Sequence, residues 1–133
     1  MQELIRLAMQ ARERAYAPYS GFTVGAALLA GNGRIYTGCN IENAAYTPSN
    51  CAERTAVFKA VSEGERNFVR IAIVGGHGGE SVAPSPCGVC LQVMAEFCEP
   101  DTFEIVMAEN EESYTVKKLG DMLPFGFTLG KGD

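Results

Sequence analysis

The chain has little of what a membrane protein or an exported protein needs. Its 133 residues include no apolar stretch near the roughly 20 residues that a membrane-spanning helix requires. It opens without the basic start and apolar run of a secretory signal. We therefore expect a cytoplasmic protein that makes no contact with a membrane.

Positive charge is also scarce. Lysine and arginine number 11 against 16 acidic residues, which gives a net charge of −5, and the basic residues form no stripe. Proteins that bind nucleic acids non-specifically usually carry a basic patch. The composition therefore disfavours a nucleic-acid partner and favours a small, uncharged substrate.

Histidine occurs only once, at His77, among glycines. A catalytic or metal-bound histidine normally needs partners that hold its ring. We therefore expect His77 to be a loop residue without a chemical role.

Cysteine, in contrast, occurs five times, an odd number that is typical of reduced, cytosolic proteins. Cys39 and Cys98 lie in a strand-like and a helix-like segment, and we expect both to be small buried side chains. The length suits a single domain over residues 1–133.

The other three cysteines belong to two short motifs, Cys51-Ala52-Glu53 and Pro86-Cys87-Gly88-Val89-Cys90. Three thiolates can bind Zn²⁺ and leave its fourth tetrahedral position open for water, which is the arrangement of a catalytic zinc site. Glu53 is spaced to stand beside the metal. Such a ligand set, with a non-ligand glutamate and a later P-C-x-x-C, is typical of zinc-dependent deaminases. We predict one Zn²⁺, bound by Cys51, Cys87 and Cys90, with Glu53 as the catalytic acid–base.

Both motifs lie where a helix is predicted to begin, and a helix N-terminus lowers the pKa of a nearby thiol. Cys87 and Cys90 are three residues apart and share a helix face. Three thiolates and one Zn²⁺ carry a net charge of about −1, so a cation near the sulfurs would help to generate hydroxide. We predict that Arg54 supplies it.

The remaining pattern alternates helices and strands, which favours an α/β fold with a mixed sheet, a hairpin first and crossovers after it. Glycines at 75–79 and the Ser/Pro-rich stretch after them predict a flexible loop. The predicted helices cover 3–15, 51–63, 86–98 and 116–122, and the predicted strands cover 22–30, 34–38, 69–74, 103–107 and 113–116.

Five segments together resemble the small, homotetrameric cytidine deaminases, in order and over essentially the whole chain. The resemblance implies a three-layer α/β/α sandwich with a five-stranded mixed sheet. It also implies hydrolytic deamination of cytidine and 2′-deoxycytidine to the uridines, a step of pyrimidine salvage. The segments are APYSGFTVGAA (17–27), GCNIENA (38–44), CAERTA (51–56), PCGVC (86–90) and LP (123–124).

The resemblance also implies substrate contacts. Phe22 matches the aromatic that packs on the pyrimidine, and Asn40 and Glu42 match the pair that hydrogen-bonds the ribose hydroxyl. Ala52 and Ser85 match positions whose backbone groups address the base. On composition alone, Phe22 would be a core residue, and Asn40 and Glu42 would be ordinary loop residues.

Tyr46 and Phe127 match aromatics that line the pocket of a neighbouring subunit, so the resemblance implies a homotetramer with shared active sites. One position departs from the family. Leu91 follows Cys90 where arginine is common. Either the zinc site is less well neutralised here, or Leu91 packs against apolar neighbours in a subunit contact.

Two other functions stay open. One is deamination of a different aminopyrimidine nucleoside, such as blasticidin S. The other is a structural zinc module or a thiol redox protein. A closed structural site would need a fourth ligand, for which Cys39 is the only plausible candidate, and redox chemistry would not explain Glu53.

Overall fold

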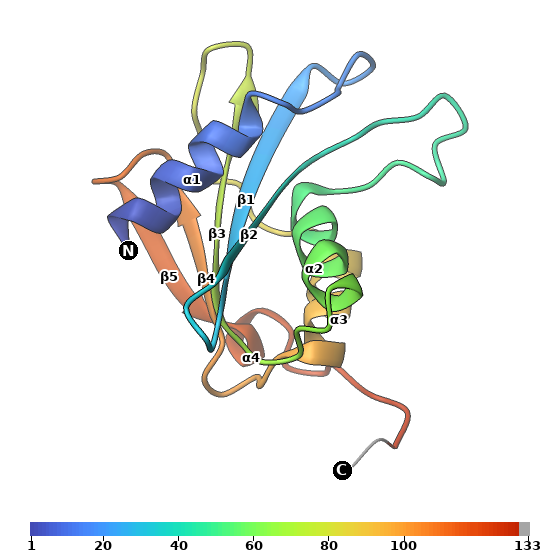
Figure 1. Cartoon of the computed structure of the whole chain (residues 1–133). Coiled ribbons are helices and arrows are strands. Elements are labelled where there is room, and N and C mark those ends of the chain that lie inside the picture. The colour runs from blue at the N-terminus through green and yellow to red at the C-terminus, as the bar shows by residue number, and fades with distance from the viewer. Residues whose placement is uncertain (131–133) are drawn as a thin grey trace.

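The computed structural model describes residues 1–130, in which five strands form one mixed sheet with helices on both faces (Figure 1). The strand order is β2-β1-β3-β4-β5, and only the β3–β4 pair is parallel. Within these residues, no helix is long and apolar enough to cross a membrane. The elements are α1 (Gln2–Arg12), β1 (Phe22–Ala30), β2 (Ile35–Cys39), α2 (Ala52–Ser62), β3 (Phe68–His77), α3 (Gly88–Phe97), β4 (Glu104–Ala108), β5 (Tyr114–Lys118) and α4 (Leu119–Met122).

The sheet separates two apolar cores. On one face, Leu4, Ile5 and Ala8 of α1 pack over Ala27 of β1 and Val74 of β3. On the other face, α2 and α3 lie side by side against the sheet (Figure 1). Their core contains, among others, Ala52, Ala56, Val57, Ile71, Ile73, Leu91, Met94 and Ile105. The predicted three-layer sandwich is confirmed.

Two glycines let helices approach the sheet closely. A Cβ atom on Gly38 of β2 would lie 2.5 Å from the backbone nitrogen of Ala56 in α2. A Cβ on Gly25 of β1 would overlap the Ala8 carbonyl oxygen of α1. Any larger side chain at Gly38 would push α2 outward, and with it Cys51 at the start of that helix.

Pairing with β1 lengthens β3 beyond its predicted end. Phe22, Thr23 and Val24 pair with His77, Gly76 and Gly75, so the predicted loop at 75–79 is wrong for its first three residues. His77 is a strand residue, and its ring packs edge-on against Phe22 with centroids 5.1 Å apart. Glycine content favoured a loop, but an available partner strand outweighed it.

Other differences are small. The first helix ends at Arg12 instead of residue 15. Crossovers follow the first hairpin between β2 and β3 and between β3 and β4, as predicted, but β4 and β5 are antiparallel neighbours. Residues 131–133 lie outside the described residues, so a single domain over 1–133 stays a prediction.

Candidate metal centre and active site

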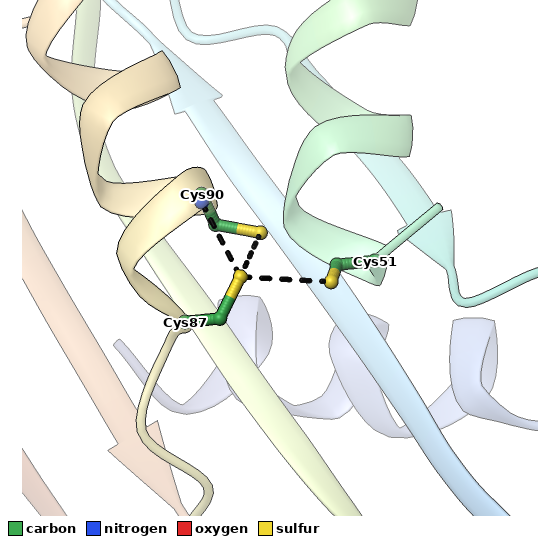
Figure 2. Close-up of side chains that lie close together, drawn as sticks. All are labelled: Cys51, Cys87 and Cys90. Atoms are coloured by element: carbon green, nitrogen blue, oxygen red, sulfur yellow. Dashed lines mark hydrogen bonds between the residues drawn. The ribbon is translucent and has the colours of Figure 1, made fainter. Parts of the chain in front are cut away.

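The N-termini of α2 and α3 meet on one face of the sheet and bring three cysteines together (Figure 2). Cys51 is the N-cap of α2, and Cys87 is the N-cap of α3. The Cys87 sulfur lies 3.9 Å from that of Cys51 and 3.4 Å from that of Cys90. All three sulfur atoms lie within 4.8 Å of one another.

These distances fit a single zinc ion. Zn–S bonds of about 2.3 Å in tetrahedral geometry place ligand sulfurs about 3.8 Å apart. Among the described residues, the only group of three or more possible ligands that could hold a metal is this cluster, and Cys39 is not in it. The geometry therefore favours an open three-ligand site over a closed site with four cysteines.

Arg54 lies against the cluster, where its Nη2 donates to the Cys51 sulfur at 3.2 Å. A hydrogen bond from the Cys90 thiol and, despite partial burial, the Arg54 guanidinium lower the pKa of Cys51 to about 5. The same sulfurs raise the pKa of Arg54, Cys51 above all. The guanidinium therefore places a positive charge beside the Cys51 sulfur.

Glu53 is the one charged residue of the described chain that is almost fully buried, at 5% exposure. It follows Cys51 by two residues but is not a member of the sulfur cluster. Burial, and after it the negative charge of Cys51, raises the pKa of Glu53 to about 7. A carboxyl group in this setting can both take and give a proton near neutral pH.

Leu91 points into the protein interior. It is 7% exposed and belongs to the same core cluster as Met94 and Val57. Of the two predicted alternatives, apolar packing therefore fits better, although the packing is within the subunit's own core.

Phe22, Asn40 and Glu42 lie close together at the start of β1. The Asn40 side chain accepts from the Val24 backbone N–H and donates to the Phe22 carbonyl, both at 2.8 Å. The Glu42 carboxylate accepts from the backbone N–H groups of Tyr19 and Ser20, at 3.0 and 3.1 Å, and from the Ser20 hydroxyl.

The other predicted substrate residues differ in exposure. Ala52 is fully buried as the first residue of α2, whereas Ser85 is exposed two residues before Cys87. Tyr46 and Phe127 are 77% and 64% exposed. Exposed aromatic side chains of this size are available for contact with another molecule.

The sequence analysis missed two residues, Arg12 and Ser20, whose hydrogen bonds connect the segments around the start of β1. Arg12 leaves α1 to bond the carbonyl oxygens of Thr23 and Glu80, and so ties β1 to the loop after β3. Ser20 bonds Glu42. Arg12 fitted the helical pattern, and Ser20 lies in a turn motif, so neither carried a separate signal.

Comparison with known proteins agrees with this geometry. A family model described as the cytidine and deoxycytidylate deaminase zinc-binding region matches residues 1–107. The chain belongs to the cytidine deaminase family. The three-cysteine cluster and the family's zinc-binding region together confirm the zinc cofactor.

Relatives in this family match over most of their length. A cytidine deaminase of Sporosarcina psychrophila is 59% identical over 98 residues, which cover 74% of this chain and 70% of that protein. One of Halalkalibacterium halodurans is 49% identical over 128 residues, 96% of this chain and 93% of that protein. The crystal structure of cytidine deaminase from Burkholderia pseudomallei superposes with a TM-score of 0.84 at 48% identity, covering 94% of this chain and 97% of that chain. The predicted enzyme class is confirmed.

Proposed function

We propose that this enzyme hydrolytically deaminates cytidine and 2′-deoxycytidine to uridine and 2′-deoxyuridine, releasing ammonia, in cytoplasmic pyrimidine salvage. The observation that carries the proposal is the sulfur cluster with a buried glutamate beside it. Cys51, Cys87 and Cys90 have their sulfur atoms within 4.8 Å of one another, and Glu53 is buried near enough to Cys51 for the charge of that sulfur to raise its pKa. Relatives that match nearly the whole chain and are named cytidine deaminases support the choice of substrate.

The cysteines hold one Zn²⁺ per subunit. When bound, the ion lowers the pKa of a coordinated water and stabilises negative charge on the attacking oxygen. Arg54 offsets the negative charge of the thiolates through its contact with Cys51. That role follows from charge balance, since three thiolates outweigh the metal's two positive charges.

Glu53 moves both protons. It takes one from the attacking water and passes it to N3 of the cytosine ring as oxygen bonds to C4. C4 is then tetrahedral and carries both a hydroxyl and the amino group. Glu53 takes the hydroxyl proton and delivers it to the amine, the C4–N bond breaks, and ammonia leaves as the C4 carbonyl forms.

Substrate contacts follow from the second group of residues. Phe22 packs on the pyrimidine ring, and backbone groups at Ala52 and Ser85 address the base. Asn40 keeps one amide hydrogen free to donate, and Glu42 keeps acceptor capacity, so the pair suits a hydroxyl that both donates and accepts. A hydroxyl that ribose and 2′-deoxyribose share would explain acceptance of both nucleosides.

We further propose a homotetramer in which Tyr46 and Phe127 complete the pocket of a neighbouring subunit. The exposure of both rings supports this arrangement. An isolated subunit would leave these aromatics in water, whereas a neighbour would bury them.

One experiment tests the function: purified protein is assayed for bound zinc and for ammonia release from cytidine, 2′-deoxycytidine and blasticidin S. We expect about one zinc per subunit and release from the first two. Zinc-loaded protein that releases ammonia only from blasticidin S would support the other nucleoside deaminase. Zinc without any release would favour a structural zinc module.

A further inference from the structure

We infer that Ser20 is a positioning residue that aims the Glu42 carboxylate at the sugar hydroxyl of the substrate. The inference rests on the proposed role of Glu42 in binding that hydroxyl. Ser20 lies in the turn between α1 and β1, and Glu42 lies in the segment after β2. A hydrogen bond between the Ser20 hydroxyl and Glu42 Oε2 joins the two segments.

The direction of this bond is fixed. The Ser20 oxygen accepts a hydrogen bond from the backbone N–H of Phe22 at 3.0 Å, so its own hydrogen is free to point at Glu42. An ionised carboxylate can only accept. Ser20 therefore connects the backbone beneath the base-packing aromatic to the carboxylate proposed for the sugar.

The number of acceptor positions on the Glu42 carboxylate explains how Ser20 can orient it. A carboxylate offers about four lone-pair positions, two on each oxygen. Glu42 Oε1 already accepts two backbone N–H groups, from Tyr19 and Ser20. Oε2 accepts only the Ser20 hydroxyl among the described residues, so the position left for a substrate hydroxyl is on that same oxygen.

Asn40 completes the geometry. Its amide is tied to β1 on both sides, at the Val24 N–H and the Phe22 carbonyl, which leaves one N–H free. Phe22 thus holds Ser20 through its N–H and Asn40 through its carbonyl. One hydrogen-bonded chain sets the donor and the acceptor for a single sugar hydroxyl.

The test is a thermodynamic cycle that combines removal of the Ser20 hydroxyl from the enzyme with removal of single hydroxyls from the substrate. KM and kcat are measured for cytidine and for its 2′-, 3′- and 5′-deoxy analogues with wild type, Ser20→Ala and Ser20→Thr. In wild type, loss of the recognised hydroxyl should raise KM about 10- to 100-fold, as expected for a hydrogen bond to a charged group. In Ser20→Ala that penalty should fall to about 3-fold or less with kcat little changed, and Ser20→Thr should restore it.

The control is Ser62→Ala, because among residues 1–130 the Ser62 hydroxyl bonds only the Lys59 carbonyl, at the opposite end of α2 from Cys51. A full penalty in Ser20→Ala, or an equal loss for all analogues that threonine does not rescue, would overturn the inference. If wild type shows no penalty for any hydroxyl, the proposed sugar contact itself fails, and the inference fails with it.

Discussion

At the scale of single residues, Glu53 combines a carboxyl group with near-complete burial beside the sulfur cluster. We predict that Glu53→Gln keeps the fold and the zinc but lowers kcat by about 10²–10⁴, because glutamine cannot move protons. Steady-state kinetics and metal analysis measure both. Glu63→Gln is the matched control, since Glu63 is exposed at the other end of α2. Near-normal turnover, or loss of zinc, would contradict the assignment.

The cysteines differ in role: some are proposed zinc ligands and others are not. We expect Cys87→Ala to lose zinc and much of its stability, because the metal would join the starts of α2 and α3. Cys98→Ala is the control: Cys98 lies in the core, and burial raises its pKa to about 12. Zinc content per subunit, measured by atomic absorption, should stay near wild type in Cys98→Ala. Release of zinc by Cys39→Ala would instead show a closed four-cysteine site.

Substitutions at Leu91 test whether this side chain matters for packing in the core or for the charge at the metal site. Because Leu91 is buried in the subunit core, Leu91→Arg should place a guanidinium among apolar side chains and destabilise the fold by several kcal/mol. Leu91→Met, of similar volume, should cost less than about 1.5 kcal/mol. Urea unfolding of the zinc-loaded proteins measures both. The opposite outcome is a stable Leu91→Arg variant in which the acidic limb of the pH–rate profile moves to lower pH. That result would show that the arginine reaches the thiolates.

At the scale of secondary-structure elements, an ion pair network joins three strands. Glu104 of β4 lies opposite Arg70 of β3 and Lys118 of β5, with an Arg70 Nη2–Glu104 Oε1 distance of 2.9 Å. Burial acts to raise the pKa of Glu104, but the two cations outweigh it and hold that pKa below its usual value. A carboxyl with a lowered folded-state pKa stabilises the fold above its unfolded pKa, and this is lost as pH falls through the folded value.

We therefore expect Glu104→Gln to lower the free energy of unfolding at pH 7 by about 1 kcal/mol. The difference from wild type should shrink below about pH 4, where the unfolded carboxyl becomes protonated. Urea unfolding between pH 7 and pH 3 measures it. Glu3→Gln, which removes an exposed pair with Arg6 at 3.8 Å, should change little at either pH. A difference independent of pH would mean that the network's charge is unimportant.

At the scale of the whole molecule, the proposed sharing of sites makes a prediction about mixtures. Phe127→Ala should weaken substrate binding, and mixing it with Glu53→Gln protein should restore some activity. After subunit exchange, one subunit can supply the intact Phe127 and another the intact Glu53. Mixing Phe127→Ala with a Phe127→Ala/Glu53→Gln double variant should restore none. A monomer by light scattering, or no recovery despite verified exchange, would contradict shared sites.

The sequence by itself determined the features that depend on neighbours along the chain. Cys87 and Cys90 share a helix turn, so their spacing alone places both sulfurs on one side. The strand at 22–30 and the helix after Cys51 follow from periodicity and turn residues, and the structure has them where they were expected. Recognition of the deaminase pattern added the fold, because its five short segments are spread along the chain from residue 17 to residue 124.

Only the tertiary structure decided the features that depend on distant residues. Cys51 meets Cys87 because α2 and α3 pack on the same face of the sheet. β3 extends through its glycines to His77 because β1 offers it hydrogen-bond partners. Leu91 is buried, and Ser20 reaches Glu42, through contacts that no local pattern encodes. The physical reason is that periodicity reports the environment of one element, whereas these contacts arise only when separate elements are brought together.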